Sequence, residues 1–425
     1  MSEPGQRRVA LARLFGSAVV SQALISAASF AVGLLLIRGT SDAQYGYYVL
    51  VTSAVLLLVS LQNAFFAPAL ASRIGPLDRH GRAQLVGGLY RAQLRLMGVL
   101  GVPLFAVAVL LWSTQRLDAA TGPLALAAVV AAVATLHREF FRLVLLTHRR
   151  PQDVLRTDLG YVALLVAGAF IATRTATPAF AAVLSLSLAA LAGGALLART
   201  LWRFEAWNPK ASMALVREIA PQAAWSASGA ASHWAFSQGY IYLVAAALDV
   251  AAVAALAATR LLLIPVILLS SGIGSLMLPM AAGWLQRDGA VPLFRRLGLS
   301  ALGLAAAALG YFALLWLARD WLFDVAMNKQ FVQRDELLLL WGVVTLVAVV
   351  RTQLAYLLAA RGQFRDLTLL TLVSAAIALT ISSLAMQRVG VTGALIGMLV
   401  GELINAVGIV ILCRRPGPAL LSAPA

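Results

Sequence analysis

The chain consists of long apolar runs separated by short polar links. Runs long enough to cross a bilayer, for which about 20 helical residues suffice, recur from the N-terminus to the C-terminus. The alternation of apolar and polar residues that is typical of membrane β-strands is missing. Only helices and closed barrels satisfy their backbone groups in lipid. The pattern therefore predicts an all-α integral membrane protein with about 12 transmembrane helices, at residues 14–37, 47–70, 94–112, 123–145, 158–177, 178–198, 221–247, 250–278, 297–317, 335–358, 367–386 and 391–412.

Composition supports this interpretation and opposes both a soluble domain and a nucleic-acid-binding protein. Of the 425 residues, 61% are hydrophobic and 12% charged, whereas a soluble domain carries about 25% charged residues. The net charge of +16 is the excess of 33 lysines and arginines over 17 acidic residues. Most of the basic residues lie in short links, a distribution that sets membrane orientation rather than nucleic-acid binding. The only cysteine, Cys413, permits no internal disulfide. The run 14–37 is longer than a signal-peptide core, so we expect a retained first helix.

The basic residues also predict an orientation. When the twelve runs are threaded through a bilayer, most lysines and arginines fall on the side of the N-terminus. Basic residues concentrate in cytoplasmic loops. Both termini of this multi-pass chain are therefore predicted to be cytoplasmic.

The spacing of the runs indicates two halves. We expect an N-terminal lobe at 1–198 with spans one to six, a cytoplasmic linker at 199–218, and a C-terminal lobe at 219–425 with spans seven to twelve. Each half opens with two long runs joined by a link that contains an aspartate, Asp42 or Asp249. Six spans per half predict lobes related by pseudo-two-fold symmetry, with a central cavity for substrate between them.

The short links exclude several kinds of activity. They leave no room for a soluble catalytic domain, and the sequence contains no GxxxxGK[ST] phosphate loop, no HExxH and no Cys/His cluster. We therefore expect neither an enzyme nor a bound cofactor or metal. Coupling to H⁺ or Na⁺ stays open.

Three segments resemble one family of transporters. SQALISAASFAVGLLLIRGTSDAQYGYYVLVTSAVLLLVSLQNAFFAPAL (21–70) resembles the first helix pair of the polysaccharide transporter family. REFFRLVLLTHRRPQDVLRTDLGY (138–161) resembles the family's junction of helices four and five, and AALAATRLLLIPVILLSSGIGSLMLPMAAGW (254–284) its eighth helix. This family of flippases belongs to the multidrug/oligosaccharidyl-lipid/polysaccharide (MOP) exporter superfamily.

The resemblance implies a function in the bacterial inner membrane. It implies a flippase that moves a polyprenyl-diphosphate-linked oligosaccharide from the cytoplasmic to the periplasmic leaflet by alternating access. Such a protein would serve O-antigen or exopolysaccharide biosynthesis, with membrane lipid and the polysaccharide assembly machinery as its partners. Multidrug exporters of the superfamily commonly carry an acidic residue in the first helix, and span 14–37 has none.

Two other functions stay open at this point. One is a multidrug/cation antiporter of the same superfamily, which the missing first-helix acid opposes. The other is a membrane-embedded polysaccharide polymerase or glycosyltransferase, which the short exterior loops oppose. A purely structural scaffold would leave the intramembrane arginines unexplained.

Two arginines inside spans are the first candidates for substrate binding. Arg260 lies about ten residues into the run 250–278, near the midplane, where a guanidinium suits the diphosphate of a lipid-linked sugar. A structural pairing is the alternative. Arg351 either lines the same cavity or extends its head to the interface. Glu402, with Asn405 on the same helical face, either binds a coupling ion or neutralises an arginine of its own lobe.

The remaining candidates are aromatic, amide and clustered charged residues. Trp225, His233 and Tyr240 recur near helical spacing and would stack on sugar rings, or simply pack helices. Gln22 and Gln62 would donate hydrogen bonds to the glycan, or link helices. A cytoplasmic mouth is predicted where helices four and five meet, serving either first contact with the diphosphate or ion pairing, at Arg138, Glu139, Arg142 and Asp158.

Overall fold

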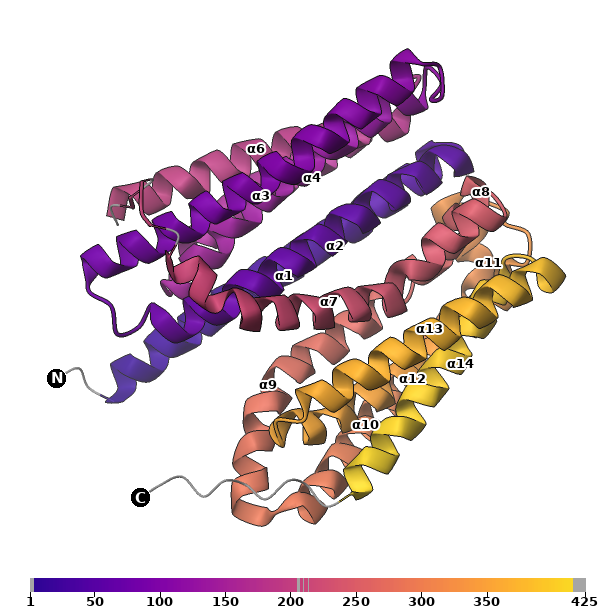
Figure 1. The fold of residues 1–425 in the computed structure, drawn as a ribbon. Helices are drawn as coiled ribbons and strands as arrows, with labels where there is room; N and C mark the ends of the chain where they lie inside the picture. Colours follow the sequence, from indigo (N-terminus) through magenta and orange to yellow (C-terminus); the bar gives the residue numbers. More distant parts are fainter. Residues whose placement is uncertain (1–3, 205–206, 209, 213, 416–425) are drawn as a thin grey trace. The chain divides into compact units, whose positions relative to one another are not determined.

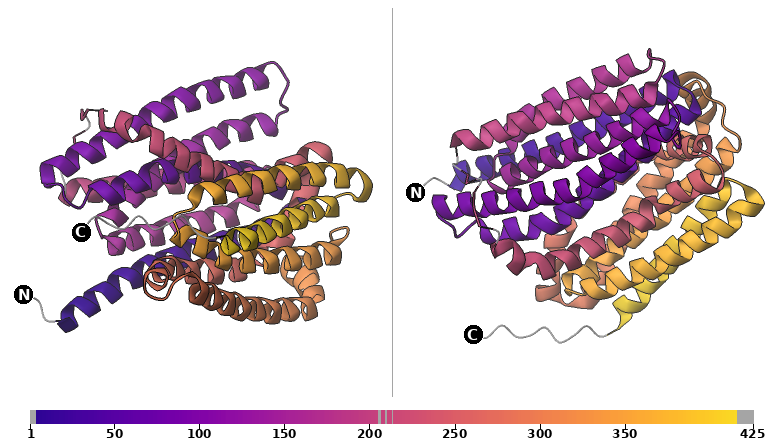
Figure 2. Two further views of the ribbon diagram at one scale, coloured as in Figure 1. Left: turned by 60° about the horizontal axis from the view of Figure 1, so that its bottom comes forward. Right: turned by 45° about the horizontal axis from the view of Figure 1, so that its top comes forward.

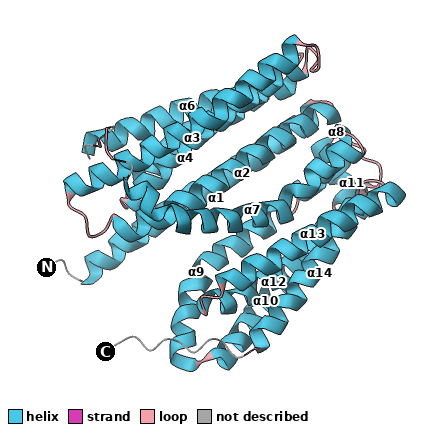
Figure 3. Ribbon diagram, in the orientation of Figure 1, coloured by secondary structure: helices cyan, strands magenta, loops and turns pink. Residues whose placement is uncertain are grey.

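The computed structural model describes residues 4–204, 207–208, 210–212 and 214–415. These residues form helices and their connections and contain no β-strand (Figure 3). The elements in chain order are α1 (Pro4–Gly39), α2 (Asp42–Arg73), α3 (Arg79–Ser113), α4 (Thr121–Thr147), α5 (Pro151–Ala172), α6 (Pro178–Phe204), α7 (Ala214–Ala247), α8 (Val250–Leu261), α9 (Ile264–Asp288), α10 (Ala290–Leu317), α11 (Arg319–Trp321), the π-helix η1 (Leu322–Met327), α12 (Arg334–Ala360), α13 (Phe364–Val389) and α14 (Thr392–Arg414).

The all-helical membrane fold predicted from the sequence is confirmed. Within the described residues, 11 helices are long and apolar enough to cross a membrane. A further long helix, α7, has 34 residues. Most helices begin or end a few residues beyond the predicted runs, because polar residues at the ends continue the backbone hydrogen bonding after the apolar pattern stops.

The prediction of one helix over 250–278 is wrong. α8 ends at Leu261 and α9 begins at Ile264, with a tight link between them in which the N–H of Leu263 bonds to the carbonyl of Arg260 at 3.0 Å. Pro265 lies in the first turn of α9. A proline ring lacks the N–H and crowds the carbonyl four residues before it. Arg260 therefore lies in the last turn of a short helix rather than in the middle of a long one.

The chain divides into two compact units, Met1–Ala231 and Ser232–Ala425. The division falls inside α7, so the first half of this helix belongs to unit 1 and the second half to unit 2. Figure 2 allows the helices of each unit to be followed by colour. The lobe boundaries and the linker at 199–218 stay predictions.

Unit 1 is built around α4, which packs against α6, α2 and α3 (Figure 1). Its core is aromatic and aliphatic, with Phe140 and Phe141 of α4 fully buried beside Leu70 of α2 and Leu197 of α6. α1 packs on α5, which in turn packs on α6. These contacts bring the middle of α4 next to the first half of α5, where charged residues meet.

The link before α4 is fixed by an aspartate side chain. Asp118 Oδ1 accepts the backbone N–H groups of Thr121 and Ala120, at 2.7 and 2.9 Å, and the hydroxyl of Thr121 at 2.8 Å. These hydrogen bonds favour the ionised carboxylate and hold the pKa of Asp118 below its ordinary value. Asp118 thus holds the link directly before α4, the helix that carries Arg138.

Unit 2 depends on close contact between α13 and α14. Gly393, Gly397 and Gly401 recur every four residues on one face of α14. A Cβ at Gly397 would lie 2.4 Å from the backbone nitrogen of Ser382, and one at Gly401 would lie 2.6 Å from the Cβ of Ala378. The two backbones approach as closely as in other small-residue contacts between membrane helices. This contact places Glu402, the next residue on α14, inside the unit.

Candidate functional site

Arg260 is held by side chains from two other helices of unit 2. Its Nη1 donates to Gln238 Oε1 at 2.9 Å and to the Tyr240 hydroxyl at 3.3 Å, both from α7. The guanidinium carbon lies 5.4 Å from the ring centroid of Trp341, a residue of α12. Trp341 is itself fixed, because its indole N–H donates to the carbonyl of Leu256 in α8 at 3.1 Å. Arg260 is thus half-buried in a polar and aromatic setting.

The charge of Arg260 has no anionic counterpart among the described residues. No described carboxylate lies within 4 Å of it, and its contacts are neutral groups. Its Nε and Nη2 groups, which form one edge of the planar guanidinium, have no described hydrogen-bond acceptor. A charge placed in a membrane protein without a partner usually faces a ligand or water-filled space.

Arg351 and Glu402 form an ion pair between α12 and α14. The Nε of Arg351 lies 2.6 Å from Oε2 of Glu402, and the two side chains are only 14% and 8% exposed. The Arg351 head is therefore held inside unit 2 by Glu402. Because the arginine neutralises the carboxylate, Glu402 is not a free acid in this structure.

Asn405 lies one turn beyond Glu402 and is buried. Its amide nitrogen donates to Ser374 Oγ of α13 at 3.2 Å. Phe236 of α7 connects this region to the rest of unit 2, since its ring lies 5.9 Å below the guanidinium of Arg351 and beside Gly401. Asn405 thus ties α14 to α13, whereas Arg351 ties α14 to α12.

Trp225, His233 and Tyr240, predicted either to stack on sugar rings or to pack helices, have different surroundings. Tyr240 is 1% exposed and packs edge-on against Trp341 at 5.7 Å. Trp225 is 52% exposed and belongs to unit 1. His233 is exposed and lies close enough to Arg351 and Arg260 to feel their charge. For Tyr240 the structure thus shows the helix-packing alternative, with contacts to α8 and α12.

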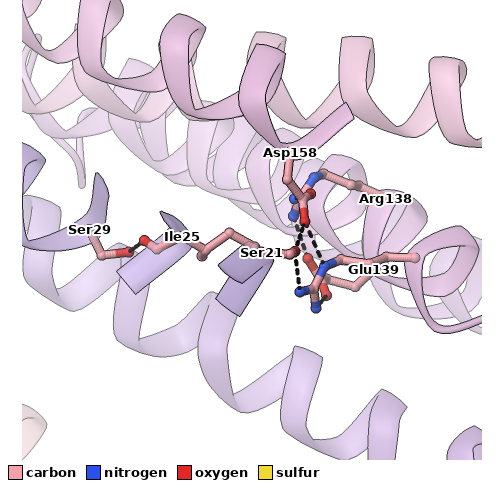
Figure 4. A network of polar contacts seen from close by, with 7 residues as sticks. Ser21, Ile25, Ser29, Arg138, Glu139 and Asp158 are labelled. Atoms are coloured by element: carbon pink, nitrogen blue, oxygen red, sulfur yellow. Dashed lines mark hydrogen bonds and ion pairs between the residues drawn. The ribbon is translucent and has the colours of Figure 1, made fainter. Parts of the chain in front are cut away.

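Unit 1 contains the second charged cluster, shown in Figure 4. Asp158 of α5 accepts hydrogen bonds from Arg138 of α4 and from the Ser21 hydroxyl of α1. Arg138 also pairs with Glu139, and Arg142 Nε lies 3.3 Å from Asp158 Oδ2. Three helices thus meet in one network of two arginines and two acids.

This network is closed to ligands in the structure. The side chains of Arg138 and Asp158 are 2% and 0% exposed. Tyr161 covers the guanidinium of Arg138 at 3.7 Å, and Gly193 of α6 makes room for its stem, since a Cβ there would lie 3.2 Å from Cδ of Arg138. Of the two alternatives predicted for the cytoplasmic mouth, ion pairing is the one that the structure shows for these two residues, because helix packing encloses them. The charges balance within the cluster.

The two glutamines of the first helix pair have different surroundings. Gln22 of α1 is exposed, whereas Gln62 of α2 is 6% exposed and its Nε2 has no hydrogen-bond partner in the described structure. Both belong to unit 1. Neither contacts the Ser21–Asp158 network among the hydrogen bonds found there.

Comparisons with known proteins were made at three levels. No protein-family model matches the chain, and no curated protein matches its sequence. Solved structures do match over nearly the full length. An inward-facing conformation of a multidrug resistance MATE family transporter of the MOP superfamily aligns with a TM-score of 0.71 at 15% identity, covering 91% of this chain and 93% of that one.

Two further matches are of the same kind. An outward-facing conformation of a multidrug resistance MATE family transporter aligns with a TM-score of 0.68 at 14% identity, covering 95% of this chain and 94% of that one. A MOP superfamily transporter from Pyrococcus furiosus, described as having a binding pocket of reverse polarity and a different function, aligns with a TM-score of 0.67 at 13% identity, covering 95% and 94%.

The chain shares its fold with solved transporters of the MOP superfamily. This confirms the fold class predicted from the sequence, while the resemblance to the polysaccharide transporter family stays a prediction. At 13–15% identity the matches concern the fold and not the cargo. The matched structures are described as transporters.

Sequence reasoning missed several neighbours of the charged residues in this MOP fold. Gln238, Trp341 and Ser21 were not singled out, although each contacts a predicted site residue. Gln238 is an amide inside an apolar run, which is a usable signal. Trp341 and Ser21 offer none, because nothing in the spacing reveals which helices lie together. Among the described residues no group of three His, Cys, Asp or Glu side chains could hold a metal ion.

We expect the Arg351–Glu402 pair to show strong coupling in a double-mutant cycle. Glu402→Ala alone should lower stability by about 2–3 kcal/mol, because it leaves a nearly buried guanidinium unpaired. The double variant Arg351→Met, Glu402→Leu should regain most of the loss, since no charge is left behind. Thermal unfolding of the purified protein, followed by size-exclusion chromatography, measures the stability of the single and the double variant. Equal melting of the single and double variants would contradict the pairing.

Proposed function

We propose that the chain is a membrane transporter whose cargo is an amphiphilic anion of the polyprenyl-diphosphate-oligosaccharide class. The observation that carries the proposal is Arg260, a half-buried guanidinium with no carboxylate within 4 Å among the described residues. A cationic drug would be repelled by this charge. A phosphate or diphosphate would be attracted to it.

The geometry of Arg260 suits a phosphate group. Gln238 and Tyr240 occupy Nη1, which fixes the plane of the guanidinium and leaves the Nε–Nη2 edge for two parallel hydrogen bonds. Trp341 shields one face of the group at 5.4 Å. Arginine is the residue best suited to bidentate phosphate recognition, because its fork matches the spacing of two oxygens.

The transport step in this proposal is a reorientation with no bond made or broken. The matched MATE structures include inward-facing and outward-facing conformations, which supports alternating access as the mode of transport. The proposal includes a location in the bacterial inner membrane with both termini in the cytoplasm. It also includes movement of the cargo toward the periplasmic leaflet and the polysaccharide assembly machinery as a partner.

Multidrug efflux is the second candidate, and the comparisons favour it. Two of the matched structures are described as multidrug resistance transporters. A cation antiporter needs an acid that can exchange its cation during the cycle. The two buried acids described above are already paired with arginines, Asp158 with Arg138 and Glu402 with Arg351. This arrangement opposes the candidate without deciding the cargo.

The test compares cargo classes and Arg260 variants in proteoliposomes that contain the full chain. A fluorescent lipid-diphosphate oligosaccharide is expected to cross, with its initial rate lowered about tenfold or more in Arg260→Ala, since charge-assisted hydrogen bonds contribute about 1.5–3 kcal/mol each. Arg260→Lys should recover part of the rate, because a point charge stays but the fork is lost.

The control is Arg388→Ala, which removes an exposed arginine at the end of α13 and should leave the rate unchanged. A parallel assay follows accumulation of a cationic dye. Dye transport without lipid transport would replace the first candidate by multidrug efflux. Lipid transport that is unaffected in Arg260→Ala would overturn the role of Arg260.

A further inference from the structure

An opening lies wholly within unit 1, and none of the charged residues of the Arg138 network lines it. It has a volume of about 470 Å³ and is bounded by α3, α4, α6 and Trp207. Its inner wall is aromatic, with Phe141 buried and Tyr90 and Trp207 half-buried. Its outer edge carries three exposed residues of α6, namely Arg199, Trp202 and Arg203. We call it the α6 groove.

The two arginines of the α6 groove lack anionic partners. No described carboxylate lies within 4 Å of Arg199 or Arg203, and neither makes a hydrogen bond in the described structure. They are four residues apart on one helix, so their like charges face each other and repel. An anion placed between them would remove the repulsion and accept hydrogen bonds from both guanidinium groups.

The aromatic wall gives the groove a fixed shape. The Trp207 ring lies 4.7 Å from that of Tyr90, 5.2 Å from that of Phe141 and 6.1 Å from that of Trp202. Trp202 is 66% exposed. Exposed tryptophan beside arginine is typical of the level at which a membrane protein meets the headgroups.

The outer face of α6 continues from the groove as an apolar strip. Leu184, Leu188 and Leu191 are 39%, 59% and 46% exposed. Together with Ala195, Arg199 and Trp202 they follow at intervals of three or four residues, so all six share one face of the helix. One side of α6 therefore offers hydrocarbon contact along its length and positive charge at its end.

The geometry points to an acidic phospholipid of the surrounding bilayer as the ligand of the α6 groove. Its phosphate lies between Arg199 and Arg203, its glycerol region contacts Trp202 and Trp207, and its acyl chains follow the leucines of α6. Basic pockets at the ends of membrane helices select anionic lipid headgroups by charge. This inference is independent of the transported cargo.

The test uses native mass spectrometry to measure lipid binding to the delipidated full chain in neutral detergent. Phosphatidylglycerol, phosphatidylcholine and water-soluble glycerol phosphate are compared as probes. We expect phosphatidylglycerol to bind at least about tenfold more tightly than phosphatidylcholine. This preference should be lost in Arg199→Gln, Arg203→Gln, since each arginine near the headgroups contributes about 1 kcal/mol.

The matched control removes two other exposed arginines, Arg156→Gln and Arg295→Gln, and should keep the preference. Equal loss in control and groove variants would mean general charge attraction and would overturn the site. Glycerol phosphate binding as tightly as phosphatidylglycerol would overturn the lipid as its occupant. If the double variant does not fold, Arg199→Gln and Arg203→Gln singly should each lose part of the preference, and unchanged binding in both would refute the proposal.

Discussion

Replacing Asp158 by alanine is expected to destabilise unit 1 more than any single charge change outside its buried network. The carboxylate is fully buried and accepts hydrogen bonds from Arg138 and Ser21, with Arg142 at 3.3 Å. Its removal leaves two guanidinium groups to share Glu139. Removing one partner of a buried ion pair costs about 3–5 kcal/mol, because the remaining charge is left uncompensated.

Each variant is heated to a series of temperatures. The fraction of protein that stays monodisperse is then measured by fluorescence-detected size-exclusion chromatography. Asp153→Ala is the control on the same helix, since Asp153 is more exposed and its arginine partners, Arg150 and Arg156, lie at the surface. Exposed pairs of this kind contribute about 0–1 kcal/mol. Equal heat resistance of the two variants would refute the network's contribution to stability.

A double variant separates charge imbalance from lost packing. Arg138→Met, Asp158→Leu removes one charge of each sign and keeps Glu139 paired with Arg142, whose Nη1 lies 3.7 Å from Oε2 of Glu139. Buried ion pairs can often be replaced by apolar residues of similar volume at little cost. We therefore expect the double variant to be more heat-resistant than Asp158→Ala. If the double variant is less heat-resistant than Asp158→Ala, packing around Arg138 and not charge determines the loss of stability.

Replacing Gly397 by leucine should separate α13 from α14. A Cβ at this position would lie 2.2 Å from Ser382 Oγ, 2.4 Å from Ser382 N and 2.5 Å from the carbonyl oxygen of Ala378. Two of these atoms belong to the backbone of α13 and cannot rotate away. Overpacking costs about 1–3 kcal/mol where side chains can adjust, so we expect at least about 3 kcal/mol here.

The control is Gly303→Leu on α10, where an added Cβ has nothing within 4 Å. It should be neutral or slightly stabilising, because leucine favours a helix more than glycine does. Gly397→Leu should also weaken the Arg351–Glu402 pair, since Glu402 follows the last glycine of the series. Heat resistance is measured as above for Gly397→Leu, for Glu402→Ala and for the variant that combines them. A weakened ion pair appears as losses of heat resistance that do not add. Full additivity would mean that the helix contact and the ion pair are independent.

The sequence by itself determined the all-helical membrane fold of the described residues. Hydrophobic runs of about 20 residues can satisfy their backbone in lipid only as helices, so composition and spacing are enough, and the fold of the matched transporters agrees with them. The run 250–278 was the exception. Pro265 was visible in the sequence, but an apolar run gives no sign of whether a proline bends a membrane helix or ends it.

The sequence also identified the charged residues, because charge inside an apolar run is conspicuous. Arg260, Arg351, Glu402 and Asp158 were all recognised in this way. Whether each is paired was decided only by the tertiary structure. Arg351 and Glu402 are 51 residues apart and Ser21 and Asp158 are 137 apart, and helical periodicity carries no information about contacts between helices.

The tertiary structure alone distinguished Arg260 from the other charges. Its neighbours Gln238, Tyr240 and Trp341 come from two other helices, and their meeting depends on how α7, α8 and α12 pack. The same packing turned Tyr240 inward and left His233 exposed, a difference that the spacing of aromatic residues does not reveal. Sequence determines which residues enter the membrane, whereas side-chain packing between helices decides which of their charges remain available to a ligand.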